Sequence, residues 1–220
     1  ARVVSTTCNT PQQTVSRYVY IPSFRVWTND PRAGGGAVAL RTGCDQVLES
    51  TYLPALKRIG IDATMQLERH GFFPAGGGIL HATVSPAAEL QHAEFVERGA
   101  LQSIDAVAML SGLATDIGVR ELQAVAKRLH LQSNALHLHE VSPSLGPGNA
   151  LLVQVRLQHH AETFTGHGER GLSAEKVADR IAGEAKAYLR GKACVGEHLS
   201  DQLLLPMALA GSGTFVVAAI

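Results

Sequence analysis

Apolar residues recur at the spacing of a helix in four stretches of the chain. In the first stretch, residues 45–60, the apolar side chains that share one face are Leu48, Tyr52, Leu56 and Ile59. Asp45 is suited to cap the start of this helix, and Gly60 is suited to the position after its end. Pro54 lacks the N–H that a helix interior uses, so we expect a kinked helix.

The same spacing predicts three more helices further along the chain. One begins at Asp116, its expected cap, and has an apolar face made of Ile117, Leu122, Val125 and Leu129. Another is capped by Ser173 and has an apolar face made of Val177, Ile181, Ala185 and Tyr188. Residues 195–213 predict the last helix, in which Pro206 is either a kink or a restart.

Short apolar or alternating runs predict the strands. Residues 61–69 and 79–84 flank a glycine-rich loop and are typical of a hairpin. Later strands are expected at 103–110, 135–141, 150–157 and 161–166. With their helices, these strands give the order β-α-β-β-β-α between residues 98 and 192, a compact α/β unit that can fold as an insert.

The ends of the chain are less regular. Residues 1–44 show little periodicity, and the only element that we expect there is a possible strand at 17–20. Residues 214–220 form the apolar start of another strand. No internal repeat of short period is visible.

Composition places the chain among globular proteins. Its 220 residues are 45% hydrophobic and 17% charged, enough for one large or two small domains. No apolar run is long enough to span a bilayer, and the first residues lack the layout of a signal peptide. Cys8, Cys44 and Cys194 are widely spaced, which predicts neither a disulfide framework nor a zinc site. We therefore expect a cytoplasmic protein with no membrane partner.

Charge and histidine content narrow the functional classes. Nineteen basic and nineteen acidic residues give no net charge, which argues against a broad basic surface along a duplex. Binding of a nucleic-acid end stays open. His137 and His139 would share one face of a strand without a carboxylate or cysteine at ligand spacing. We expect these histidines to be solvated and assign no metal site.

The loop "RHGFFPAGGG", residues 69–78, contains three consecutive glycines. Glycine loses more conformational freedom on folding than any other residue, so these glycines need a structural or functional reason. The N–H groups of the loop, with Arg69 and His70 as further donors, are able to cradle an anion. Alternatively, the glycines allow close packing against a neighbouring helix. We favour packing because no helix start with a lysine follows, as it does in a P-loop. Phe72 and Phe73 are then expected in the core.

Residues 196–202 begin the last predicted helix and are rich in hydrogen-bond acceptors. Glu197 and Asp201 lie four residues apart, as do His198 and Gln202, so each pair shares a helix face. One interpretation is a solvated first turn, where the helix dipole favours each carboxylate by roughly 0.3–1 kcal/mol. The other is a nucleotide site, in which a carboxylate accepts a hydrogen bond from a ribose or amino group. The residues alone do not decide between them.

These motifs resemble a known family. Residues 70–80 resemble, without a gap, the signature loop of the RNA 3′-terminal phosphate cyclases, whose pattern falls on His70, Gly71, Pro74, Gly76, Gly77 and Gly78. Residues 52–61 resemble the helix that leads into that loop, and residues 172–181 resemble the last helix of the family's insert. Residues 195–213 resemble the adenylate-contacting segment, which implies ATP contacts at Glu197, His198, Leu199, Ser200, Asp201 and Gln202.

The resemblance, which covers residues 45–220, implies an α/β (α+β) fold. A large domain of repeated sheet-plus-two-helices units would comprise residues 45–97 and 193–220. A thioredoxin-like β-α-β-β-β-α domain, residues 98–192, would be inserted in it. Residues 1–44 are unassigned and atypical of the family.

The resemblance also implies an activity, with ATP and RNA 3′-phosphate ends as partners. ATP would drive conversion of the 3′-phosphate into a 2′,3′-cyclic phosphate, through a histidine-AMP adduct and an RNA-adenylate. A divalent metal, Mg or Mn, would offset the charge of the triphosphate.

Two features depart from the family pattern and leave two interpretations. The nucleophilic histidine should lie beyond Ile220, and the family's N-terminal part has no counterpart in residues 1–44. We therefore expect an inactive fragment of a cyclase that forms no covalent AMP adduct. The alternative is a non-catalytic, cyclase-like scaffold in ribosome assembly or RNA processing. The residues "HLSDQ", 198–202, favour the enzyme because a scaffold needs no nucleotide pocket.

Overall fold

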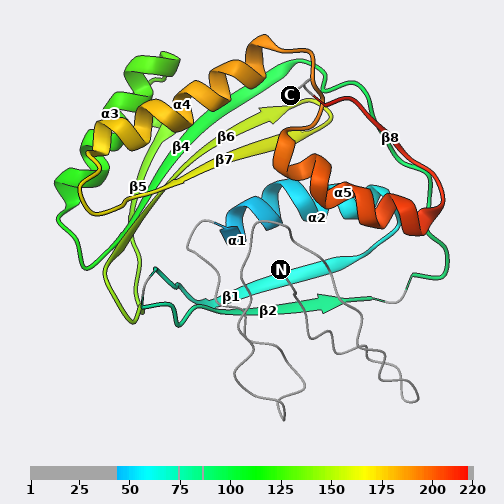
Figure 1. The fold of residues 1–220 in the computed structure, drawn as a ribbon, viewed down its shortest axis with the longest axis horizontal. Helices are drawn as coiled ribbons and strands as arrows, with labels where there is room; N and C mark the ends of the chain where they lie inside the picture. The colour runs from blue at the N-terminus through cyan, green and yellow to red at the C-terminus, as the bar shows by residue number, and fades with distance from the viewer. Residues whose placement is uncertain (1–43, 74, 86, 218–220) are drawn as a thin grey trace.

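The computed structural model describes three ranges of the chain: residues 44–73, 75–85 and 87–217. The possible strand at 17–20 and Pro74 lie outside them. Helices and strands are mixed, so the fold is of the α+β class. Figure 1 shows a four-stranded sheet with two long helices over one face. The first helix, the last helix and the hairpin lie on the other side of that sheet (Figure 1).

The first helix has three parts: α1 (Cys44–Val47), a π-helical turn (Leu48–Tyr52) and α2 (Leu53–Arg58). The π-helical turn ends two residues before Pro54, and Leu53 donates its N–H to the carbonyl oxygen of Leu48, five residues back. Pro54 has no N–H with which to continue the ladder. The irregularity expected at Pro54 therefore takes the form of a wider helical turn.

The predicted ends and buried face of this helix are largely confirmed. The predicted apolar residues are all buried: Leu48, Tyr52, Leu56 and Ile59. Gly60 follows the end with a φ of +88°, a left-handed conformation that glycine adopts without strain. At the other end, Asp45 lies inside the first turn of α1 rather than before it.

The hairpin is confirmed, with a first strand that begins two residues later than expected. Strands β1 (Ala63–Arg69) and β2 (Ile79–Val84) pair in antiparallel fashion, and Leu67 lies opposite Leu80. The register is irregular between Leu67 and Arg69, immediately before the glycine loop. The loop therefore begins where the regular strand pairing ends.

The four-stranded sheet has the order β5-β4-β6-β7. Its strands are β4 (Leu101–Ser111), β5 (Leu136–Glu140), β6 (Gly148–Leu157) and β7 (Ala161–His167). β4 pairs with β5 in parallel and with β6 in antiparallel fashion, and β6 pairs antiparallel with β7. Helices α3 (Thr115–Leu129) and α4 (Ala174–Arg190) cover one face (Figure 1). The order of elements predicted for this stretch is confirmed.

One of the two predicted caps in this unit is wrong. Ser173 does cap α4, because its hydroxyl oxygen accepts a hydrogen bond from the N–H of Lys176 at 3.4 Å. The cap of α3 is Ala114, which offers no side-chain bond. Asp116 lies inside the first turn instead, where the helix dipole still favours its negative charge.

The last helix, α5 (Glu197–Ala210), runs through Pro206, which lies inside it. The strand expected at 214–220 is short in the described part of the chain: β8 (Thr214–Phe215) pairs in parallel with β3 (Glu94–Phe95). No helix among the described residues is long and apolar enough to cross a bilayer.

Two large hydrophobic cores and two smaller clusters hold the elements of the described residues. One core joins the first helix, the hairpin and α5, and its most buried members include Ile59, Phe95 and Leu203. The other lies between the sheet and helices α3 and α4. Buried hydroxyls link the two regions, because Thr51 Oγ1 lies 3.1 Å from Thr163 Oγ1 of β7.

A buried carboxyl group lies beside the second core. Glu121 of α3 is fully buried, and its Oε2 accepts a hydrogen bond from the amide of Asn149 at 2.7 Å. Asn149 Oδ1 in turn accepts from the N–H of Gly168 at 2.9 Å. Burial raises the pKa of Glu121 to about 7; the Asn149 bond opposes this rise and the charge of Glu175 adds to it.

We expect Glu121→Gln to reduce the dependence of stability on pH. The pKa of Glu121 is about 7 in the folded chain against an ordinary 4.5, so its stabilising contribution is full below pH 4.5 and is lost as the pH rises through 7. Between pH 5 and pH 8 the free energy of unfolding should therefore fall by about 2 kcal/mol more in the parent than in the variant. Urea denaturation at each pH measures this difference.

The control for this prediction is Glu140→Gln, which changes an exposed carboxylate at the end of β5. It should keep the pH dependence of the parent. Identical pH dependence in the parent and in Glu121→Gln would show that Glu121 is not a buried acid with a raised pKa.

Candidate functional site

The residues of the predicted nucleotide segment form the first two turns of α5. Glu197, His198 and Asp201 are exposed on its surface. The remaining three are buried: Leu199, Ser200 and Gln202. Gln202 is only 3% exposed, so it does not share an exposed face with His198 as expected. The groups available to a ligand are therefore two carboxylates and one imidazole.

A buried carboxylate fixes the start of α5. Glu162 Oε2 accepts a hydrogen bond from the N–H of Gly196, the residue that precedes the helix, at 3.0 Å. His160 Nε2 donates to the same oxygen at 2.9 Å, and both side chains are almost completely buried. A negative charge at this end of a helix is favoured by the helix dipole. The buried Glu162 thus fixes the first turn of α5 on its inner side, while the outer face of that turn is exposed to solvent.

The segment that leads into α5 is also anchored. Arg98 donates to the carbonyl oxygens of Tyr188 at 2.8 Å, Leu189 at 2.9 Å and Gly191 at 2.7 Å, all at the end of α4. The hydroxyl of Tyr188 donates to the carbonyl oxygen of Cys194 at 2.7 Å. The short connection between α4 and α5 therefore has a defined path.

Charged side chains of α4 lie close to the exposed face of α5. Partial burial raises the pKa of Glu184, and the nearby charges of Arg180 and His198 oppose the rise whereas that of Glu197 adds to it. The exposed face of α5 is thus bordered by carboxylates, with the imidazole of His198 and the cation of Arg180 nearby. Such a surface offers acceptors for the hydroxyl and amino hydrogens of a nucleoside.

The metal expected for the family has no cluster of ligands in the described part of the chain. No group of three or more His, Cys, Asp or Glu side chains is arranged there to hold a metal ion. His137 Nε2 does approach Asp105 Oδ1 to 3.9 Å, but that carboxylate bonds more closely to Arg156. His137 and His139 are exposed, as expected.

The glycine loop packs against the segment that joins β5 to β6. Gly76 and Gly77 have φ values of +67° and +75°, which glycine adopts without strain. A Cβ at Gly77 would overlap the side chain of Leu145, and a Cβ at Gly146 would lie 2.5 Å from that of Ala75. His70 forms a β-bridge with Ser144 in the same segment. The close approach explains why the loop uses glycine.

Two expectations for this loop need correction. Its packing partner is a loop rather than the helix that we expected. Phe72 is buried against Gly148, as predicted, but Phe73 is 75% exposed and does not belong to the core. Arg69, a donor only in the anion-binding alternative, uses its Nε to donate to the carbonyl oxygen of Gly77 at 2.6 Å.

The structure does not bring the two motifs together. The glycine loop contacts Gly148 at the start of β6, whereas the α5 site rests on Glu162, which pairs with Val155. Seven residues of strand separate Gly148 from Val155, or roughly 23 Å at the usual rise. Of these two motifs, the α5 face is the one whose ionisable side chains are exposed.

We expect Gly77→Ala to destabilise the fold more than Gly76→Ala does. Both residues have positive φ, which costs an alanine roughly 1–2 kcal/mol. Only at Gly77 would the new methyl group also overlap Leu145, whereas at Gly76 nothing lies within 4 Å. Urea denaturation should therefore show about 1 kcal/mol of additional loss at Gly77. Truncating Leu145 to alanine in the Gly77→Ala variant should recover this additional loss of stability. Equal losses in Gly76→Ala and Gly77→Ala would show that close packing against Leu145 is not the reason for glycine at position 77.

Sequence reasoning missed Glu162, His160 and Arg98. His160 and Glu162 are two residues apart in an extended segment, so their side chains point to the same side. That pattern was a usable signal, because a carboxylate and an imidazole on one face of a buried strand form a pair. Arg98 gave no local signal, since all its partners lie about ninety residues away.

Comparisons with a family model and with curated proteins point to the same family. A family model described as RNA 3′-terminal phosphate cyclase matches residues 33–220. The chain is 46% identical over 168 residues to the RNA 3′-terminal phosphate cyclase of Pseudomonas fluorescens, covering 76% of this chain and 49% of that protein. It is 45% identical over 165 residues to the Ralstonia nicotianae protein of that name, covering 74% and 47%.

A third relative extends the same result to a more distant source. The protein of the same name from Koribacter versatilis is 41% identical over 168 residues, which cover 76% of this chain and 47% of that protein. The chain thus spans about half the length of the curated relatives that it matches. Because the family match runs through both motifs and through most of the sequence, the chain belongs to the RNA 3′-terminal phosphate cyclase family.

Proposed function

We propose that the protein acts as an RNA 3′-terminal phosphate cyclase, which uses ATP to convert an RNA 3′-phosphate into a 2′,3′-cyclic phosphate. The observation that carries the proposal is the exposed face of Glu197, His198 and Asp201 on a helix that Glu162 anchors. This face lies within the residues that match the family model. A family member that lacked this exposed face would instead be expected to act as a non-catalytic scaffold.

The chemistry explains why an adenine nucleotide is needed. The dianion of a phosphate monoester repels an attacking hydroxyl. Transfer of the adenylyl group of ATP to the terminal phosphate, with release of pyrophosphate, turns that phosphate into an electrophile with AMP as leaving group. The neighbouring 2′-hydroxyl then attacks the phosphorus, loses its proton and displaces AMP, which closes the ring.

In this chain, we assign nucleotide-binding roles to the α5 residues. Asp201 and Glu197 accept hydrogen bonds from ribose hydroxyls or from the amino group of adenine. His198 donates to the nucleotide and is not the nucleophile. Leu199, Ser200 and Gln202 lie inside and keep the helix in place. The described residues form no cluster of ligands for Mg or Mn.

We also propose that residues 98–192 are an inserted, thioredoxin-like domain. The sheet and its two helices complete their pairing within this range, which supports a separate unit. Arg98 bonds to the carbonyl oxygen of Gly191, so the chain enters and leaves the unit at neighbouring points. Residues 45–97 and 193–220, which share the first core, would then belong to the large domain and its sheet-plus-two-helices units.

Two measurements test the proposed function. Calorimetry with ATP and this chain should show binding, whereas a scaffold that lacks a nucleotide site would show none. In an activity assay with the protein, an end-labelled RNA 3′-phosphate should become resistant to phosphatase in the presence of ATP and Mg²⁺. An RNA with a 3′-hydroxyl should stay unchanged. Absence of both ATP binding and cyclisation would overturn the proposal.

A further inference from the structure

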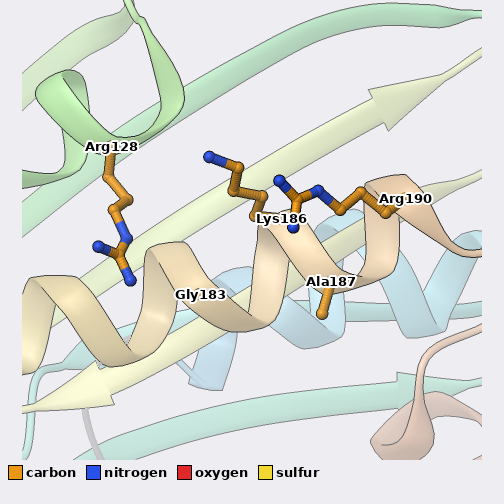
Figure 2. A pocket seen from close by; sticks show the side chains of 5 residues that line it. All are labelled: Arg128, Gly183, Lys186, Ala187 and Arg190. Carbon is orange, nitrogen blue, oxygen red and sulfur yellow. The ribbon is translucent and has the colours of Figure 1, made fainter.

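A basic pocket of about 380 Å³ lies between α3 and α4, away from the α5 face. Its lining residues are Arg128, Gly183, Lys186, Ala187 and Arg190. Figure 2 shows Lys186 and Arg190 extending from α4, and Arg128 reaching from the end of α3 toward the same helix. Three of the five side chains are cationic and none is acidic. The pocket therefore has the charge of an anion site.

Carboxylates of the chain neutralise these cations only weakly. Arg128 Nη1 lies 3.7 Å from Asp179 Oδ1, and both side chains are more than half exposed, so the pair contributes little. Within the described ranges, neither Lys186 nor Arg190 forms an ion pair with a carboxylate. Arg128 and Arg190 also lie in the last turns of their helices, where the dipole favours cations. The dipole does not explain why three cations converge on one pocket.

The glycine in the pocket gives a second, independent observation. Gly183 lies inside α4, where glycine costs about 1 kcal/mol relative to alanine. Its φ is not positive, and a Cβ at this position would meet nothing within 4 Å. Neither backbone conformation nor packing within the described chain therefore requires glycine. Its effect is to leave space beside the cations for a group from outside the chain.

We propose that this basic pocket binds the sugar-phosphate backbone of single-stranded RNA. The assignment rests on the proposed function, because the bound strand would be the one whose 3′ end is the substrate. Three cations suit a few phosphates, which agrees with a chain of zero net charge that has no broad basic surface. No aromatic side chain lines the pocket, so the contact is independent of base sequence.

Helix α4 connects this pocket to the candidate nucleotide site. Lys186 and Arg190 line the pocket, whereas Glu184 of the same helix lies within electrostatic range of Glu197 and His198. An RNA strand held in the pocket would therefore cross the helix that borders the α5 face. The pocket supplies affinity for internal phosphates and takes no part in the chemistry at the 3′ end.

The first test compares two charge variants. Lys186→Gln/Arg190→Gln removes two cations of the pocket, and Arg170→Gln/Lys176→Gln removes two exposed cations near the start of α4, outside the pocket. Fluorescence anisotropy of a labelled twelve-nucleotide RNA measures affinity at several KCl concentrations. The pocket variant should bind at least about fivefold more weakly, and its salt dependence should be shallower by about 1.4 in log–log slope. The control variant should lose less than about twofold.

The second test leaves the charges in place. Gly183→Leu puts a side chain into the open space of the pocket and replaces glycine with a strong helix former. The melting temperature should stay the same or rise, while RNA affinity falls at least about threefold because the backbone can no longer approach α4. Unchanged RNA affinity in this variant would show that the RNA does not occupy the pocket.

The outcomes separate this proposal from the proposed function. Affinity for RNA should fall equally whether the RNA ends in a 3′-phosphate or a 3′-hydroxyl, and calorimetry with ATP should be unaffected in the pocket variant. Equal losses in the two charge variants, or no RNA binding by the parent chain at low salt, would overturn the pocket proposal even where ATP binds. Absence of ATP binding with a selective loss of RNA affinity would instead overturn the nucleotide site and leave the pocket.

Discussion

Asp201→Ala is expected to weaken ATP binding by more than about tenfold, because a charge-assisted hydrogen bond contributes roughly 1.5–3 kcal/mol. Asp201 is exposed on the second turn of α5, and among the described residues its carboxylate forms no ion pair. Alanine is also a good helix former, so the fold should not lose stability. Isothermal titration calorimetry with ATP measures the affinity, and circular dichroism verifies the fold.

The matched control is Asp179→Ala, which removes another exposed carboxylate, on α4, that pairs only weakly with Arg128. It should leave ATP affinity within about twofold of the parent. Asp201→Asn should fall between the parent and Asp201→Ala, since the amide oxygen still accepts but carries no charge. Parent-like affinity in a folded Asp201→Ala variant would remove α5 from the nucleotide site.

Glu162→Ala should have the largest effect on stability, a loss of about 3 kcal/mol or more in the free energy of unfolding. The substitution leaves the N–H of Gly196 and the imidazole of His160 without their acceptor. Because the imidazole is buried, water does not replace the lost carboxylate at full strength. The start of α5 should loosen, so ATP affinity should fall as well. Urea denaturation followed by circular dichroism measures the loss.

Two variants make this prediction specific. Glu162→Gln keeps the shape and one acceptor oxygen, so it should lose less stability than Glu162→Ala. Glu169→Ala removes an exposed carboxylate in the loop before α4 and should stay within about 0.5 kcal/mol of the parent. A loss below about 1 kcal/mol in Glu162→Ala would mean that Glu162 does not hold α5 in place.

The elements of the fold were predictable because they depend on neighbours within a few residues. The apolar faces of the first helix and of α4, and the bounds of the hairpin, follow from spacing along the chain. One local rule failed at the start of α3. Asp116 resembles a cap, but the helix begins at Thr115 after Ala114, so the charge of Asp116 falls inside the first turn.

The candidate site was predictable only in part. The acceptor-rich start of α5 was visible in the residues, and family resemblance gave it a meaning that spacing did not. The burial of Gln202 was not visible, because it depends on which face of α5 meets the first core. Glu162 was missed for a similar reason: its contact with Gly196 spans thirty-four residues.

The sequence by itself determined most helices and strands of the described residues, the family resemblance, and the acceptor-rich start of α5. Tertiary structure alone decided that Leu145 fills the space above Gly77, that Glu162 supports α5, and that Arg128 shares a pocket with Lys186. The physical reason is the range of the interactions. Backbone hydrogen bonding and side-chain periodicity act over a few residues, whereas these contacts join segments far apart in sequence, which meet only once the sheet and its helices have packed.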